Sequence, residues 1–271
     1  MEKALLEVTD LSIDYGDNRI IDDISFSLME GAFSFILSPN KSGKTTLVKA
    51  LSGIIYSSSG KIIVNDLELS KSSLKDYLLN ISIILDDIDD QFLCSKVNDE
   101  LRYPLINLNY SDKDINNIVD NVSNIIGIST ILGKDISRLT YFEKVQVLIA
   151  VSIVHSPKIM FIDDMLRFLD NNERKEILKI LKSINKELGI TILLTTSDIN
   201  NVIKEKDIIL MNNGKIIERN SFDKIIIRDN ELEKMGLHIP IMVDLSRKLQ
   251  FYNLIDEIYY KPEEVVDRLW K

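Results

Sequence analysis

The run of residues 40–46 reads NKSGKTT, a composition typical of a loop that binds phosphate groups. The window of residues 38–45 fits the template G-x-x-x-x-G-K-[ST] at its last three positions, Gly43, Lys44 and Thr45. In such a loop the backbone N–H groups and a helix start face the phosphates, the lysine reaches the terminal phosphates and the hydroxyl binds Mg²⁺. The alternative is a surface turn that binds nothing.

The flanking residues predict the elements that position such a loop. Residues 32–37 form an apolar run of strand length, and residues 45–55 have apolar positions at helical spacing that end near Gly53. The first glycine of the template is replaced by Ser38. A Cβ there opposes close approach and positive φ, so we expect weaker phosphate binding but not its loss.

A second set of reactive groups lies roughly 120 residues after Lys44. Residues 158–164, KIMFIDD, predict an apolar strand that ends in two carboxylates. Asp163 is placed to direct Mg²⁺ and Asp164 to act as the catalytic acid, although such a pair alone is often a solvated turn. A helix over 171–188 and a strand over 190–196 follow, and this alternation predicts a parallel sheet covered by helices.

Composition limits the class of protein. The chain has 271 residues, 45% hydrophobic and 28% charged, enough for one large domain with an appendage. It has no run of eighteen apolar residues and no signal-peptide core, so any membrane role is expected to come through a partner. The net charge of −9 argues against nonspecific nucleic-acid binding. Cys94 is expected to be a small buried apolar residue, and His155 and His238 predict no metal centre beyond phosphate-bound Mg²⁺.

The order of these and other segments resembles an ABC-type ATPase along nearly the whole chain. Within that superfamily, residues 89–101 and 235–250 are similar to the ATPase subunits of energy-coupling factor transporters, the vitamin and cobalt or nickel importers. The segments that carry the broader resemblance are Tyr15, the phosphate loop, IILDDIDDQ (83–91), LTYFEKVQV (139–147), IMFIDD (159–164), FLD (168–170), TTSD (195–198) and NNGKIIERN (212–220).

The resemblance implies a P-loop ABC ATPase fold of the α/β class. Residues 1–225 are expected to form the ATPase domain, with a parallel core sheet, a β-rich start and a helical insert over about 80–155 nested within it. Residues 226–271 are expected to form a C-terminal helical appendage. Its aromatic residues, Tyr252, Tyr259, Tyr260 and Trp270, indicate a dimer contact in preference to a ligand site.

Several family positions are changed in this chain. Tyr15 matches the aromatic residue that stacks on adenine, although a half-buried strand tyrosine is the alternative. Lys41 replaces a common glycine, Asp86 the Mg²⁺-sensing glutamine, Asp164 the glutamate that polarises water, and Ser197 the histidine that contacts the γ-phosphate. The candidate nucleotide-binding residues are Tyr15, Asn40, Lys41, Ser42, Gly43, Lys44, Thr45 and Thr46; the metal ligands are Thr45, Asp86 and Asp163; the catalytic residues are Asp164 and Ser197.

The signature segment departs most from the family. Where the family has Leu-Ser-Gly-Gly-Gln/Glu, residues 139–143 read LTYFE. The family glycines let a helix start approach the γ-phosphate bound by the opposite subunit, so Tyr141 and Phe142 are expected to hold the backbone away or fill the space. The alternative is that the two rings pack beneath a helix. Asp170 matches the subunit-contact aspartate.

The function that the resemblance implies is the ATP-binding subunit of an energy-coupling factor importer of a vitamin or metal ion, with ATP and Mg²⁺ as cofactors. The alternative is a catalytically impaired subunit paired with an active paralogue. The expected partners are a paralogous ATPase in a heterodimer, a transmembrane coupling subunit and a substrate-binding membrane protein, at the cytoplasmic face of the cell membrane. An ABC protein acting on nucleic acid is a weaker possibility, because of the negative charge.

Overall fold

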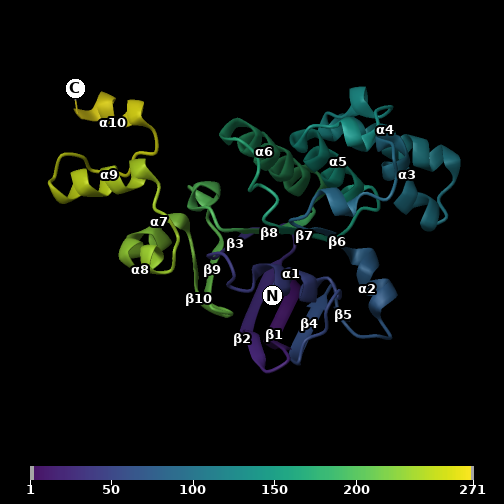
Figure 1. Cartoon of the computed structure of the whole chain (residues 1–271), viewed down its shortest axis with the longest axis horizontal. Helices are drawn as coiled ribbons and strands as arrows, with labels where there is room; N and C mark the ends of the chain where they lie inside the picture. The colour runs from purple at the N-terminus through teal and green to yellow at the C-terminus, as the bar shows by residue number, and fades with distance from the viewer. Residues whose placement is uncertain (1–2, 270–271) are drawn as a thin grey trace.

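A six-stranded sheet forms the centre of the structure, a computed structural model that describes residues 3–269. The strand order is β10-β9-β3-β8-β7-β6 (Figure 1), and all neighbours are parallel except β10, which is antiparallel to β9. The predicted parallel core sheet is thus confirmed, with one antiparallel strand at its edge. The bounds are β3 Phe33–Leu37, β6 Ile81–Ile84, β7 Ile159–Asp163, β8 Thr191–Thr196, β9 Ile208–Asn212 and β10 Lys215–Asn220.

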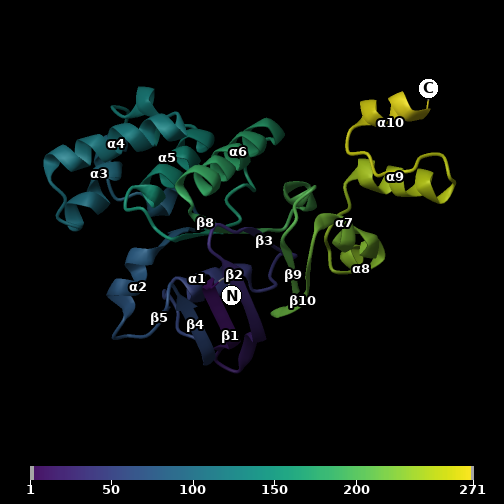
Figure 2. The same cartoon turned by 180° about the vertical axis from the view of Figure 1, so that it is seen from behind.

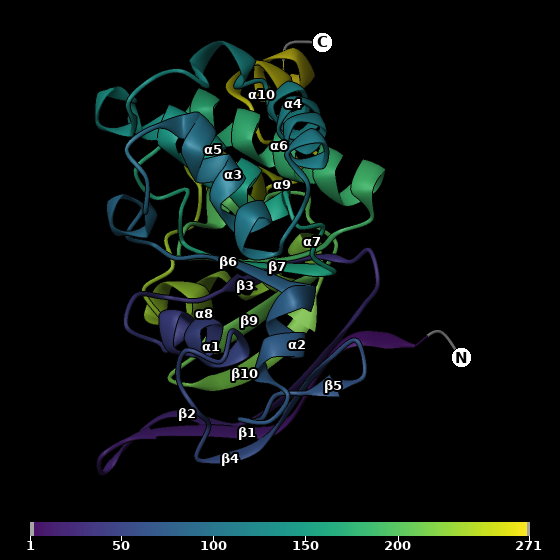
Figure 3. The same cartoon turned by 90° about the vertical axis from the view of Figure 1, so that its right-hand side faces the viewer.

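Both faces of this sheet are buried, which explains why its strands read as continuous apolar runs. Along β3, Phe35 and Leu37 belong to one core cluster, whereas Ile36 between them belongs to the other. Figure 3 shows the sheet between a group of helices on one side and α1 with a second sheet on the other. The helices on the first side are α3 Val97–Asn107, α4 Asp112–Ile126, α5 Tyr141–Ile153 and α6 Asn171–Leu188.

The second sheet is antiparallel, in the order β2-β1-β4-β5, and shares a buried core with α1. Strand β1 pairs with both β2 and β4. The elements of this layer are β1 Ala4–Tyr15, β2 Asn18–Met29, α1 Lys44–Leu51, β4 Ser59–Val64, β5 Leu67–Glu68 and α2 Leu74–Asn80. This arrangement places the start of α1 between the two sheets.

The C-terminal helices lie beyond the edge strand β10, at the opposite end of the molecule from α3 and α4 (Figures 1 and 2). They are α7 Phe222–Ile225, α8 Asp229–Lys234, α9 Ile241–Phe251 and α10 Pro262–Leu269. Trp270, one of the aromatic residues expected at a dimer contact, lies outside the described residues. No helix among residues 3–269 has the length and apolar character needed to cross a bilayer.

Short 3-10 helices connect several of these elements. The helix predicted to end near Gly53 ends at Leu51, two residues earlier, and Gly53 takes a positive φ of 72° that turns the chain away. The predicted helix over 171–188 is confirmed. The 3-10 helices are η1 Asp89–Gln91, η2 Ser129–Ile131, η3 Ile136–Arg138, η4 Ile199–Val202 and η5 Ile226–Arg228.

Candidate nucleotide site

The phosphate loop, residues 38–43, connects the end of β3 to the start of α1. Gly43 directly precedes the helix with a φ of +102°, which side chains other than hydrogen rarely allow. A Cβ at this position would lie 2.8 Å from Cδ1 of Ile21 and 3.2 Å from the carbonyl oxygen of Ile20. The backbone therefore has a conformation and a neighbourhood that require glycine here.

The two departures from the loop template have different structural consequences. The backbone N–H of Ser38 donates a hydrogen bond to the carbonyl of Thr196 at 3.0 Å. The Ser38 hydroxyl is hydrogen-bonded to the Ser42 hydroxyl. Ser38 is therefore accommodated by hydrogen bonds inside the loop. Lys41 is exposed and takes a positive φ of 63°, a conformation that costs a non-glycine residue roughly 1–2 kcal/mol.

The amine of Lys44 lies beneath the loop. Its Nζ donates to the carbonyl oxygens of Ser38 and Pro39, each at 2.9 Å. Burial lowers the pKa of this lysine, and the negative charges of Asp164 and Asp163 partly offset that effect. The lysine is thus positioned by the loop and faces both acids at the end of β7.

Asp163, the last residue of β7, is fully buried. Its Oδ1 accepts a hydrogen bond from the Thr195 hydroxyl at 2.6 Å, whereas its Oδ2 has no hydrogen-bond partner among the described residues. Burial raises the pKa of this carboxyl, and the hydroxyls of Thr195 and Thr45 lower it in part. A buried carboxylate oxygen without a partner, next to a threonine hydroxyl, fits the oxygen ligands that Mg²⁺ prefers.

Asp164 continues directly from Asp163 but points into the open cleft. It has a positive φ of 39°, its N–H donates to the Thr195 hydroxyl at 3.1 Å, and its Oδ2 accepts from the Ser197 hydroxyl at 3.3 Å. The structure therefore brings the two residues predicted to be catalytic into contact with each other.

A cleft of about 470 Å³ gathers most of the predicted site residues. Tyr15 does not line it: this residue ends β1 and is 50% exposed. Ser42 and Asp163 are buried behind the cleft, and Ser197 reaches it only through Asp164. The cleft is lined by Ile20, Asn40, Lys41, Gly43, Lys44, Thr45, Thr46, Asp86, Asp164 and Arg167.

Two of these lining residues, Ile20 and Arg167, belong to no sequence motif and were not predicted. Ile20 lies on β2, whose sheet packs on α1, so its place follows from tertiary contacts that spacing does not reveal. Arg167 lies three residues after Asp164, in the segment between β7 and α6. A positive charge so close to the acidic pair is the only signal that could have found it.

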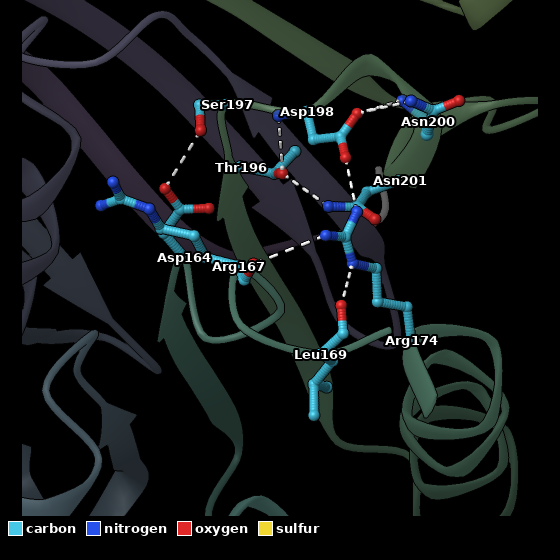
Figure 4. A network of polar contacts seen from close by, with 9 residues as sticks. All are labelled: Asp164, Arg167, Leu169, Arg174, Thr196, Ser197, Asp198, Asn200 and Asn201. Atoms are coloured by element: carbon cyan, nitrogen blue, oxygen red, sulfur yellow. Dashed lines mark hydrogen bonds and ion pairs between the residues drawn. The ribbon is translucent and has the colours of Figure 1, made fainter. Parts of the chain in front are cut away.

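A hydrogen-bond network centred on Arg174 connects the segment after β7 to the segment after β8 (Figure 4). The arginine donates to the carbonyls of Leu169 at 2.8 Å and Arg167 at 3.4 Å. It also donates to the Asp198 carboxylate at 2.6 Å, in a partly buried ion pair. Because one guanidinium bonds to both segments, the residues around Asp164 are held relative to those around Ser197.

The signature segment forms the start of α5. Thr140 caps the helix in a capping box with Glu143. The Tyr141 hydroxyl donates to the carbonyl of Met165 at 3.3 Å, and its ring meets Phe168 edge-on at a centroid distance of 5.7 Å. Burial, followed by nearby acidic side chains, raises the pKa of Tyr141 to about 12. Tyr141 thus packs within its own chain.

Phe142, the second aromatic residue of the signature, is partly buried against the same core cluster as Tyr141. Both side chains therefore take the packing arrangement that was the alternative in the sequence. Whether they also keep the helix start away from a partner's nucleotide stays a prediction.

The phosphate loop joins a parallel strand to a helix, and the buried Asp163 ends a parallel strand of the same sheet, which is the arrangement of a P-loop nucleotide-binding protein. The family model described as ABC transporter matches residues 21–167, more than half of the chain. The chain therefore belongs to this family.

Relatives along the full length narrow the assignment to the energy-coupling factor transporter ATP-binding proteins. The chain is 30% identical to EcfA1 of Lacticaseibacillus paracasei, which bears that name, over 93% of this chain and 91% of that protein. It is 28% identical to EcfA1 of Streptococcus thermophilus, over 98% of both chains.

Two solved structures are similar to this chain, one along most of its sequence and one in fold alone. The structure of cbiO1 from Clostridium perfringens, described as part of the ABC transporter complex cbiONQ, is similar with a TM-score of 0.79 and 28% identity, covering 91% of this chain and 100% of that one. A dimeric bacterial ABC transporter cassette shares the fold, with a TM-score of 0.71, 18% identity and coverage of 80% and 98%.

Proposed function

We propose that this chain is the nucleotide-binding subunit of an energy-coupling factor importer, and that it binds Mg²⁺-ATP in the cleft between the phosphate loop and the end of β7. It works at the cytoplasmic face of the membrane with a transmembrane coupling subunit and a substrate-binding membrane protein, for a vitamin or a metal ion. The names of the full-length relatives and of the cbiO1 complex support these partners.

The observation that carries the nucleotide assignment is the buried Asp163 oxygen that lacks a hydrogen-bond partner. Asp163 and Thr45 would hold Mg²⁺, and Asp86 lines the same cleft. When bound, Mg²⁺ neutralises charge on the phosphate oxygens. Lys44 and the loop amides supply the remaining positive potential for the phosphates.

Calorimetric titration of the full chain with ATP in the presence of Mg²⁺ tests this proposal. Wild type is expected to bind, and Lys44→Ala to lose most of the affinity, because Lys44 is the cation held under the loop. Lys179→Ala is the matched control, because Lys179 is exposed on α6 and does not line the cleft, so this substitution removes one positive charge without changing the site. Absence of binding by wild type would refute the proposal.

We further infer that hydrolysis at this chain's own phosphate loop is slow. Asp164 is one methylene shorter than glutamate, and a displacement of about 1 Å at a reacting group costs on the order of 10²-fold in rate. The Ser197 hydroxyl is already donated to Asp164 and carries no charge. The short Asp164 side chain and the uncharged Ser197 favour the second candidate function, a catalytically impaired subunit that supports an active paralogue.

A paralogous partner follows from this inference. In the head-to-tail pairing implied by the family, each ATP lies between one subunit's loop and the other's signature. A homodimer would then combine the changed acid with the aromatic signature at both sites, whereas a heterodimer with an intact paralogue would not. Coexpression with a paralogue followed by native mass spectrometry tests the pairing. Exclusive homodimers with rapid ATP hydrolysis would contradict it.

A further inference from the structure

Arg167 has a place in the cleft that none of the motifs explains. It lines the cleft together with Lys44 and Thr45, and it also lines an adjoining cleft of about 300 Å³ together with Asp86 and Tyr141. Lys44 and Thr45 belong to the loop side of the site, whereas Arg167 follows β7 on the side of the acids. Arg167 and Asp164 line the same cleft, and both side chains are drawn in Figure 4.

The backbone of Arg167 is held from several directions. Its N–H donates to the carbonyl of Asp164 at 3.2 Å, and its carbonyl accepts from Arg174 at 3.4 Å. Leu166 on one side is fully buried, and Leu169 is 3% exposed. The side chain of Arg167 therefore extends from a fixed point and not from a mobile loop.

The N–H groups of the Arg167 guanidinium have no partner within the described part of the chain. Among residues 3–269 the side chain makes no hydrogen bond or ion pair, and it has a cation–π contact with the Phe168 ring, 5.4 Å from the ring centroid. Arg167 nevertheless belongs to the site, because it lines the same cleft as Lys44 and Thr45. All five N–H donors are thus available to a ligand.

A phosphate group bound in this cleft would need a positive charge on the side of the acidic residues. Lys44 and Asp164 line the same cleft, so a terminal phosphate bound by Lys44 would face the Asp164 carboxylate, and two negative groups at short range repel each other. Ser197, the other polar residue beside Asp164, carries no charge. Arg167 is the cation on this side of the cleft among the described residues, and a guanidinium suits phosphate oxygens because it can donate two parallel hydrogen bonds.

We propose that Arg167 contacts the terminal phosphate of a bound nucleoside triphosphate and thereby makes the site distinguish triphosphate from diphosphate. This role rests on the proposed nucleotide function of the same cleft. A diphosphate lacks the group that Arg167 reaches, so only triphosphate binding depends on this residue. Arg167 then supplies, from the segment after β7, a positive charge that position 197 does not.

Calorimetric titrations of the full chain with Mg²⁺ and either ADP or a non-hydrolysable ATP analogue test this role. Arg167→Ala is expected to weaken binding of the ATP analogue roughly tenfold, the size of one lost charged hydrogen-bond contact, and of ADP by less than about twofold. Arg167→Lys keeps the positive charge but cannot donate two parallel hydrogen bonds, so its loss of affinity for the ATP analogue should be intermediate. Lys179→Ala removes one positive charge elsewhere and should change neither affinity.

The outcomes separate the two proposals. Wild type that binds neither nucleotide overturns the proposed function and this role with it. Wild type that binds both, with an unchanged affinity ratio in Arg167→Ala, overturns only the role of Arg167. Thermal unfolding of each variant checks that the fold is kept. If Arg167→Ala does not fold, Arg167→Lys decides the test: its affinity for the ATP analogue relative to ADP must be lower than that of wild type.

Discussion

The buried acid Asp163 leads to a prediction in which stability and function change in opposite directions. In the nucleotide-free chain the Oδ2 of Asp163 has no hydrogen-bond partner among the described residues, and its Oδ1 accepts a hydrogen bond from the Thr195 hydroxyl. Asp163→Asn keeps the shape and the Thr195 hydrogen bond but removes the buried charge. Leaving a charged group unsatisfied in the interior costs about 1–3 kcal/mol or more of folding free energy. The amide N–H₂ of the asparagine is also buried without a partner, so the substitution removes only part of this cost.

We therefore expect Asp163→Asn to raise the free energy of unfolding of the nucleotide-free chain by about 1–2 kcal/mol at neutral pH, which shifts Tm upward by roughly 2–8 °C. Saturating Mg²⁺-ATP should reverse the order. Ligand at about a hundred times its Kd stabilises wild type by about 2.7 kcal/mol, whereas the variant has lost a metal ligand and gains much less. The two Tm values should thus cross between the free and the ligand-bound proteins.

The pH dependence of this difference has a defined sign. Burial raises the pKa of Asp163 above 3.8 in the folded chain. The folded state therefore binds the proton more tightly than the unfolded state, so the favourable contribution is complete below pH 3.8 and is lost as pH rises through the folded pKa. The advantage of Asp163→Asn should grow over that range and shrink on acidification.

Differential scanning fluorimetry over a pH series, with and without Mg²⁺-ATP, measures all of these effects. Asp120→Asn is the matched control, because Asp120 is exposed on α4 and should change neither Tm nor its response to ligand. A nucleotide-free Asp163→Asn less stable than wild type at neutral pH would refute the reasoning about burial. An undiminished response to Mg²⁺-ATP would refute the assignment of the metal ligand.

Three further predictions concern catalysis and the backbone. Asp164→Glu combined with Ser197→His should raise phosphate release from the assembled complex by up to about 10²-fold; an unchanged rate would place the limitation elsewhere. Lys41→Gly should raise Tm by relieving the positive φ of 63°, whereas Lys41→Val should lower it, and equal effects would contradict strain at this position. Gly214→Ala should cost about 3 kcal/mol or more in denaturant unfolding, because its Cβ would lie 2.1 Å from the Ile20 carbonyl; a neutral effect would contradict that close approach.

Elements with clear local signals could be predicted from the sequence. The helix α6 matches its predicted range because both ends are marked, by a capping box at Asp170 with Glu173 and by Gly189 in the left-handed conformation. The end of α1 was predicted near Gly53 and lies at Leu51, and the apolar pattern continues beyond it because Ile55 still packs against the core. Periodicity reports which residues are buried, and burial continues where the helix does not.

In the candidate site, too, the residues with local sequence signals could be predicted and those placed by tertiary contacts could not. The phosphate loop and the acidic pair could be located because each follows a strand and each has a required residue type at a fixed spacing. The place of Arg167 could not, because it depends on Arg174, a residue of another element that holds its carbonyl. The direction of the Tyr141 side chain likewise depends on Met165 and Phe168, which are distant in sequence.

The unpartnered oxygen of Asp163 also bears on which residues a chain keeps when it binds metal and nucleotide. Most proteins lie close to the stability that they need, so substitutions that stabilise without harm to function are readily accepted. A chain that had stopped binding metal and nucleotide would gain stability from any neutral residue at position 163. The aspartate at position 163 is therefore the residue expected of a chain that binds Mg²⁺ and nucleotide, as we propose, whatever rate of hydrolysis positions 164 and 197 allow. In the cycle that we propose, this subunit contributes by holding a nucleotide, and hydrolysis takes place mainly at the site of its partner.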